Sequence, residues 1–288
     1  HTFVIEEKYN FNRSTIKTFL LDQVKSILLG GILGGGILAL IILAYLSLGS
    51  TFFIAAFAIV AGFSLFMLLF YSSLIVPLFN KQTPLKEGDL KNKILDFAKE
   101  VNFPIKEIYV MDGSKRSSKA NAYFTGLGKT KRIVLFDTLI EQLTEDEIVA
   151  VLAHEVGHAK KKHVIQSMIF SFAQQLLMFY LLSLVIEYPI SSKVLGSDTH
   201  TFELGLLFFS FIFSPFSEIT SIALSIFSRK NEYEADAFAK EYQLKEPLIS
   251  GLKKISKNAL VNLTPHPLVV KCTYSHPTLL QRITNLNK

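Results

Sequence analysis

Residues 26–80 read SILLGGILGGGILALIILAYLSLGSTFFIAAFAIVAGFSLFMLLFYSSLIVPLFN, and this uncharged stretch decides the fold. The tripeptide Gly49-Ser50-Thr51 interrupts it near its middle. A helix needs about 20 apolar residues to cross the hydrocarbon core of a bilayer. The stretch therefore predicts two membrane-spanning helices, near 27–46 and 53–77, which are joined by a tight turn.

Two further apolar runs occupy 164–186 and 204–227, so the sequence predicts four transmembrane helices. The second run contains the carboxylate of Glu218. A carboxylate inside a membrane costs a few kcal/mol unless it is paired or hydrated, so a buried helix of a soluble domain is the alternative for this run. Gln174 and Gln175 on the preceding run are the candidate partners of Glu218.

The composition supports a membrane protein and excludes several other classes. Half of the residues are hydrophobic, and the mean hydropathy is +0.36. The single Cys272 excludes an internal disulfide and a multi-cysteine metal site. The net charge of +6 does not indicate a nucleic-acid partner, because the basic residues flank the apolar runs and no nucleic-acid motif accompanies them. The lipid bilayer is therefore an expected partner.

The distribution of Lys and Arg predicts the orientation in the membrane. The segment 81–162 is rich in both, whereas the loop 187–203 has only Lys193. The positive-inside rule therefore places the long segment and both termini in the cytoplasm. We expect a multi-pass integral membrane protein with its active site on the cytoplasmic side of a bacterial inner membrane or an endoplasmic reticulum membrane.

The segment between the second and third spans has the pattern of a soluble domain. A helix is predicted at 90–101, from apolar residues at helical spacing. A short strand is predicted at 105–111. Residues 120–124 and 132–136 predict a β-hairpin, joined through the glycine-containing stretch 126–130.

The helix predicted over 143–162 carries the motif that indicates chemistry. It starts with a Thr-x-x-Glu capping box and contains HEVGH at 154–158. His154 and His158 are four positions apart and share a helix face, so both imidazoles can bind one ion, with Glu155 beside them. Zinc suits this donor set, because it accepts neutral imidazole and carboxylate and keeps a position for water.

The third ligand can follow one of two templates. The metzincin pattern needs a third histidine at the position of Val164, and His163 is one residue out of register. That template fails.

A later acidic segment, SRKNEYEAD at 228–236, supplies the other template. Glu232 and Asp236 share a helix face, so Glu232 can be the third ligand while Asp236 accepts the outer N–H of a ligating histidine. Glu234 points elsewhere on this helix. A solvated acidic helix start is the alternative interpretation.

With these motifs in place, the chain resembles the type 1 CAAX prenyl endopeptidases, which are membrane gluzincins that trim the C-termini of prenylated proteins. The resemblance rests on blocks spread over almost the whole chain. Besides HEVGH they are EEKYNFN near the start, SKRSSKANAYF at 114–124, KRIVLFDTL at 131–139, FSPFSE at 213–218, SRKNEYEADAFAK at 228–240 and YSHPTLLQR at 274–282.

The resemblance implies a mainly α membrane protein with four transmembrane helices and a cytoplasmic zincin-like catalytic domain that includes a small β-hairpin or sheet. It implies one Zn²⁺ per chain and a specific set of site residues: the metal ligands His154, His158 and Glu232, the general base Glu155, the catalytic His276, the outer partner Asp236, and the substrate-binding Asn121, Ala122, Tyr123 and Arg282. Asn121 is expected on an edge strand that pairs with the substrate backbone. His276 and Arg282 are expected beside the scissile peptide, and a helix that starts at Pro277 would bring Arg282 back toward His276.

The predicted domain organisation has four segments: 1–80 with two spans, 81–163 with the HExxH helix, 164–227 with two spans, and 228–288 with the third ligand. Family members have additional N-terminal spans that help to enclose a chamber, so we expect a complete metal site here with an incomplete chamber. A quality-control protease like the bacterial heat-shock gluzincins is the alternative function. A non-catalytic membrane scaffold is a third.

Overall fold

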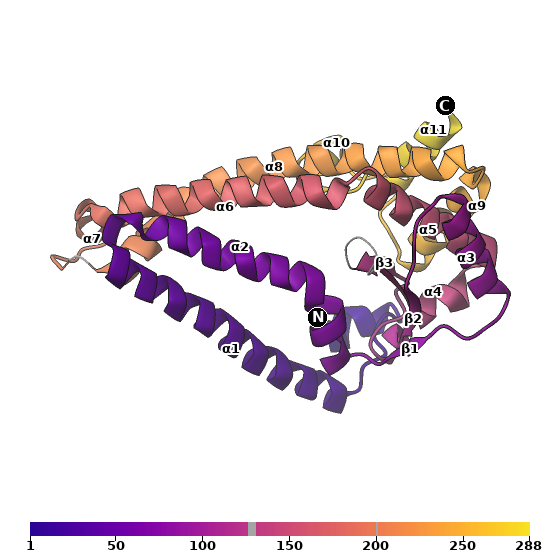
Figure 1. Cartoon of the computed structure of the whole chain (residues 1–288), viewed down its shortest axis with the longest axis horizontal. Coiled ribbons are helices and arrows are strands. Elements are labelled where there is room, and N and C mark those ends of the chain that lie inside the picture. The colour runs from indigo at the N-terminus through magenta and orange to yellow at the C-terminus, as the bar shows by residue number, and fades with distance from the viewer. Residues whose placement is uncertain (126–130, 200) are drawn as a thin grey trace. The chain divides into compact units, whose positions relative to one another are not determined.

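The computed structural model describes residues 1–125, 131–199 and 201–288, which are mainly helical with one small sheet (Figure 1). The helices are α1 (Ile16–Leu48), α2 (Phe52–Phe70), α3 (Asp89–Glu100), α4 (Asp137–Gln142), α5 (Glu145–Lys160), α6 (His163–Glu187), α7 (Ile190–Val194), α8 (Phe202–Glu241), α9 (Lys245–Asn258), α10 (Pro267–Thr273) and α11 (Leu279–Asn287). The strands are β1 (Gln82–Pro84), β2 (Glu107–Met111), β3 (Ala122–Thr125) and β4 (Arg132–Phe136).

Within these described residues, three helical stretches are long and apolar enough to cross a membrane: Ile16–Leu78, His163–Glu187 and Phe202–Glu241. The first contains both α1 and α2. A short 3₁₀ turn at Gly49–Thr51 separates these helices, at the predicted position, and Gly49 has a φ of +54° that suits a residue without a side chain. The count of four separate spans stays a prediction.

Helix α8 is longer than the sequence suggested. The apolar run and the acidic segment that follows it form one helix, Phe202–Glu241, and Pro215 lies inside it. The third candidate ligand is therefore on the same continuous helix as an apolar run. Gln174, one of the two candidate partners of Glu218, donates its amide to the Thr220 hydroxyl at 2.9 Å, and the pairing of Glu218 stays a prediction.

The chain divides by its contacts into two units. One comprises 1–22, 68–163 and 225–288, and the other comprises 23–67 and 164–224. The four segments predicted from the sequence stay a prediction. The second unit has its own apolar core, which is rich in aromatic side chains; its buried members are Phe52, Ala56, Phe179, Leu182, Ile186, Phe202 and Phe209.

The first unit contains the whole sheet, in the order β1-β2-β4-β3. Strands β3 and β4 are antiparallel neighbours, which confirms the predicted pairing, while β2 and β4 are parallel. The connection at 126–130 lies outside the described residues. Strand β3 is therefore at one edge of the sheet, and β1, which the sequence analysis missed, is at the other.

Helix α5 is fixed at its start and along its side. The predicted capping box is confirmed, since Thr144 and Glu147 bond each other's backbone N–H. The buried Glu147 carboxylate also accepts hydrogen bonds from Ser250 at 2.6 Å and from Lys254 at 2.7 Å, both on α9. Burial opposes ionisation of Glu147, but these donors and the Thr144 N–H lower its pKa to about 2. The helix that carries HEVGH is thus held to α9 by a carboxylate that stays charged.

Candidate metal centre

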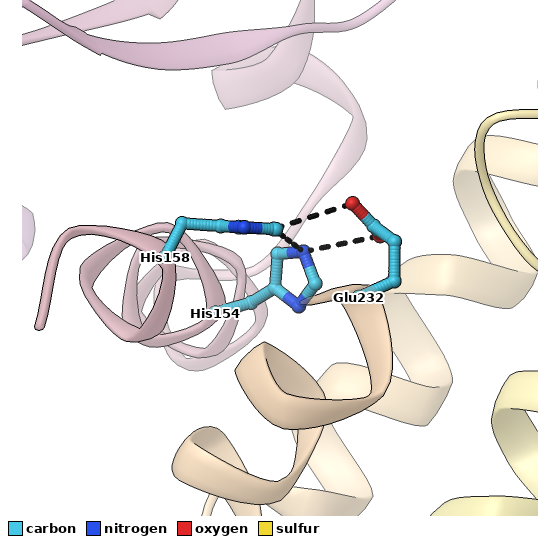
Figure 2. A group of neighbouring side chains, drawn as sticks. All are labelled: His154, His158 and Glu232. Atoms are coloured by element: carbon cyan, nitrogen blue, oxygen red, sulfur yellow. Dashed lines mark hydrogen bonds and ion pairs between the residues drawn. The ribbon is translucent and has the colours of Figure 1, made fainter. Parts of the chain in front are cut away.

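Three side chains from two helices converge in the first unit (Figure 2). His154 and His158 extend from one face of α5, and Glu232 faces them from α8. Their ligand atoms all lie within 4.8 Å of one another. The two Nε2 atoms are 3.1 Å apart, and the Glu232 carboxylate is 3.2 Å from His158 Nε2 and 3.4 Å from His154 Nε2. Bonds of about 2 Å from one ion produce separations of this size between its ligands.

The donor set fits a cation. Each histidine uses its Nδ1 atom for a contact outside the cluster, which leaves the Nε2 atoms facing each other and the carboxylate. The Glu232 Oε2 atom is buried and has no hydrogen-bond partner among the described residues. Two imidazole lone pairs and a buried carboxylate repel one another unless a positive ion lies between them. These residues therefore fit Zn²⁺.

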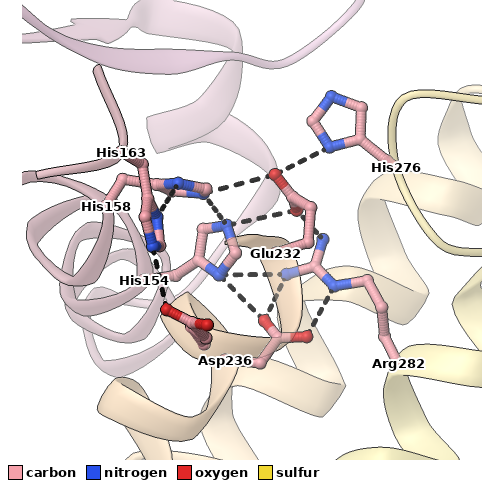
Figure 3. Close-up of polar contacts among 8 residues, drawn as sticks. His154, His158, His163, Glu232, Asp236, His276 and Arg282 are labelled. Carbon is pink, nitrogen blue, oxygen red and sulfur yellow. Dashed lines mark hydrogen bonds and ion pairs between the residues drawn. The ribbon is translucent and has the colours of Figure 1, made fainter. Parts of the chain in front are cut away.

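A second carboxylate and an arginine lie on the outer side of His154 (Figure 3). The His154 Nδ1–H donates to Asp236 at 2.8 Å, which fixes the tautomer that leaves Nε2 free. Arg282 donates to the same carboxylate from Nε at 2.9 Å, and its Nη1 is 3.6 Å from Glu232. The Arg282 side chain is thus engaged behind the ligands, and its predicted contact with substrate stays a prediction.

His158 has a different outer partner, which the sequence analysis did not identify. Its Nδ1 is 3.0 Å from Nδ1 of His163, whose Nε2 is 3.2 Å from Glu234. From the sequence, His163 was considered only as a metal ligand and was one residue out of register. Glu234 was expected to point away from the metal ligands. Lys162 has a left-handed φ of +60° between α5 and α6, and this turn brings His163 back against α5. Helical periodicity carries no signal for such a turn.

Glu155 lies beside His154 on α5 and is half-buried. Burial raises the pKa of its carboxyl above the usual range of a glutamate. A carboxylate with a raised pKa is a stronger base, so this environment suits proton abstraction from a bound water.

His276 reaches the cluster from the chain that precedes α11 (Figure 3). Its Nδ1 is 3.0 Å from the Glu232 carboxylate, while the side chain is 67% exposed. It also lines a cavity of about 350 Å³ together with Leu252, Val261 and Leu279. The helix considered after His276 is present: Thr278 caps it and α11 begins at Leu279, two residues after Pro277.

The residues predicted to bind the substrate backbone lie at the start of β3. Phe136 donates its N–H to the Asn121 carbonyl at 3.0 Å, so this carbonyl faces β4. Backbone groups of successive residues point to opposite sides of a strand, which turns those of Ala122 and Phe124 to the free edge. The Asn121 side chain accepts the Ala122 N–H at 2.9 Å, and the Tyr123 hydroxyl lies 3.3 Å from the Ser72 hydroxyl.

The two helices that carry the ligands approach closely at one residue. A Cβ atom on Gly157 would lie 3.0 Å from Cα of Ala235 and 3.0 Å from Cβ of Phe238. Contacts this short force neighbouring atoms to move, so α5 and α8 can lie this close only because residue 157 has no side chain.

We expect Glu232→Ala to lower the metal content of the purified protein, because it removes a ligand. Asp236→Ala should keep the three ligands and weaken metal affinity by about 10–100-fold, because it removes only the partner that orients His154. Metal analysis and chelator competition on both variants test this order. If Asp236→Ala loses more metal than Glu232→Ala, the two roles are exchanged.

Two family models together match nearly the whole chain. The model described as peptidase family M48 matches residues 84–288. The model described as CAAX prenyl protease N-terminal, five membrane helices, matches residues 1–81.

Individual relatives give the same result. A CAAX prenyl protease 1 homolog from Arabidopsis thaliana is 41% identical over 98% of this chain and 67% of that protein. CAAX prenyl protease 1 from Saccharomyces cerevisiae is 38% identical over 99% of this chain and 66% of its own length. The crystal structure of Ste24p from S. mikatae has a TM-score of 0.92 and 37% identity, and covers 99% of this chain and 70% of that one. The chain spans about two thirds of the length of these relatives.

Proposed function

This chain belongs to peptidase family M48, among the CAAX prenyl proteases, and we propose that it is a zinc-dependent membrane endopeptidase that cleaves near the C-terminus of prenylated proteins. It is a multi-pass membrane protein and a metalloendopeptidase. The observation that carries the proposal is the convergence of His154, His158 and Glu232 within 4.8 Å, with a base beside them. We place this site on the cytoplasmic side, following the distribution of positive charge.

We assign a separate role in peptide hydrolysis to each residue of the site. His154, His158 and Glu232 hold one zinc ion, which when bound lowers the pKa of a water to about 7 and polarises the substrate carbonyl. Glu155 accepts the proton of the attacking water and passes it to the leaving amine. His276 is exposed beside Glu232, where it can donate to the oxyanion that develops on the cleaved carbonyl. Arg282 and Asp236 keep His154 oriented.

The substrate is proposed to add a strand to the free edge of β3. An extended peptide pairs with exposed backbone groups at a sheet edge. In this protein those groups belong to Ala122 and Phe124, and the Ala122 N–H donates to the Asn121 side chain at 2.9 Å, a bond that a substrate carbonyl would replace. We therefore assign substrate pairing to the segment that begins at Asn121, with Tyr123 facing β4.

We expect Ala122→Pro to reduce kcat/KM on a peptide by up to about tenfold, because it removes one outward backbone donor. The substitution also removes the hydrogen bond from the Ala122 N–H to the Asn121 side chain, but it leaves the three metal ligands in place, so metal content should not change. Steady-state kinetics and metal analysis measure both effects. Unaltered kinetics in Ala122→Pro would mean that the substrate pairs elsewhere.

The proposed activity is tested with three substrates and the purified full chain: a farnesylated CAAX peptide, the same peptide without the lipid, and an unfolded membrane protein. Cleavage of the farnesylated peptide, lost on chelation and restored by zinc, supports the proposal. Preference for the unfolded protein would assign the chain to quality control. A zinc-loaded chain that cleaves none of them would overturn the proposed activity.

A further inference from the structure

The two histidines of the metal cluster differ in how their outer nitrogens are held (Figure 3). His154 donates directly to a carboxylate, Asp236, which Arg282 also holds. His158 instead meets another imidazole: its Nδ1 is 3.0 Å from Nδ1 of His163. His163 is buried, with 3% of its side chain exposed, and its second nitrogen is 3.2 Å from the Glu234 carboxylate.

The directions of these hydrogen bonds follow from the proton count of each ring. A neutral imidazole has one N–H and one lone pair. If Nε2 of His158 ligates a metal, its lone pair is on Nε2 and its proton is on Nδ1. That N–H must then donate to the lone pair on Nδ1 of His163. His163 keeps its own proton on Nε2, where the acceptor is Glu234.

In this chain of hydrogen bonds each donated N–H therefore meets an acceptor: His158 donates to His163, and His163 donates to Glu234. Reversing the direction would make His163 donate to Nδ1 of His158, which would leave the His158 proton on Nε2, inside the ligand cluster. A metal ion and that proton cannot share the nitrogen. The Glu234 carboxylate excludes the reversal. An ionised carboxylate can only accept a hydrogen bond, so the His163 proton must be on Nε2, which faces Glu234.

We infer that His163 and Glu234 are positioning residues for the metal: they fix His158 in the tautomer that binds, and they transmit the charge of Glu234 to it through one neutral ring. This inference rests on the proposed zinc site. His163 does not act as a ligand while its Nδ1 faces the outer nitrogen of His158. Outer-shell partners of this kind are known to set the basicity and orientation of a ligating histidine.

Two substitutions of His163 separate the hydrogen bond from the packing. His163→Leu fills similar space without an acceptor, so zinc affinity should fall by about 10–100-fold. His163→Asn places an amide oxygen near the former Nδ1 and should recover most of that loss. Glu234→Gln keeps the acceptor and removes the charge, so its loss of affinity should be smaller than that of His163→Leu. Glu241→Gln, an exposed position of the same helix, should bind zinc as the unmodified chain does.

The experiment uses the full chain in detergent. Zinc affinity is measured by competition with a chromophoric chelator, and the cobalt(II)-substituted protein gives the ligand-field absorption of the site. The expected result is a weaker affinity and a changed cobalt spectrum for His163→Leu, with both restored toward the original in His163→Asn. Neither readout depends on cleavage of any substrate.

The inference is overturned if His163→Leu matches the unmodified chain in both measurements, or if His163→Asn is as weak as His163→Leu. If His163→Leu does not fold, Glu234→Gln decides, because it preserves size, and an unchanged affinity and spectrum there would also overturn the inference. An unmodified chain that binds no zinc would instead contradict the proposed function, so the two failures are distinguishable.

Discussion

Glu155→Gln is expected to keep its full complement of zinc and to lose cleavage by about a hundred- to ten-thousand-fold in kcat, the usual contribution of a general base. The amide has nearly the size of the carboxylate and leaves the three ligands in place, but it cannot accept a proton from water. Burial raises the pKa of the Glu155 carboxyl and so makes it a stronger base, whereas the amide of glutamine does not titrate and cannot act as a base.

The measurement pairs metal analysis with single-turnover cleavage of a lipidated peptide. Asp146→Asn provides the control, because Asp146 is exposed in the first turn of the same helix and pairs with Lys93. Undiminished cleavage by zinc-loaded Glu155→Gln would show that Glu155 is not the general base. Loss of zinc would place it among the residues that hold the metal.

His276→Ala should reduce kcat by about a hundred- to a thousand-fold, which is the usual effect of removing one donor to a developing oxyanion. The effect on KM should be smaller, because the interaction is made chiefly in the transition state. Zinc should be retained, since His276 touches Glu232 from the exposed side and three ligands remain without it.

Steady-state kinetics and zinc content are the readouts for His276→Ala. His266→Ala is the matched control. His266 is also near the C-terminus, but its side chain caps α10 by accepting the Leu268 N–H. A His276→Ala protein without zinc would make His276 a ligand. Unchanged kcat would leave it a residue of the turn before α11.

Local sequence patterns predicted the parts of the site that depend on neighbouring residues. The capping box of Thr144 and Glu147 satisfies backbone groups within one helical turn, so its sequence determines its structure. The common face of His154 and His158 likewise follows from helix geometry alone. Strands β2 and β4 each place buried apolar residues in the sheet, among them Ile108 and Ile133, and both strands were predicted from their residue pattern.

Features that depend on distant contacts were predicted less well. Strand β1 is three residues long and includes Pro84, so pairing with β2 defines it rather than propensity. Helix α1 starts at Ile16, well before the uncharged run, and its first turns contain Asp22, which pairs with Arg116 at 2.7 Å. The hydrogen bond of Arg282 to Asp236 also arises from tertiary packing, while its place near the scissile peptide stays a prediction. No pattern in 279–287 alone specifies that carboxylate.

The contact at Gly157 limits how the HEVGH motif can vary. Of its two middle positions, Val156 is a core residue that another apolar side chain of similar volume can replace. Residue 157 has no such latitude, because even a methyl group would meet the backbone of Ala235, one residue from Asp236. A methyl group there would require atoms of α8, the helix that also carries Glu232, to shift by a few tenths of an ångström. Over evolutionary time we therefore expect residue 157 to stay glycine as strictly as the ligands themselves, although it binds nothing.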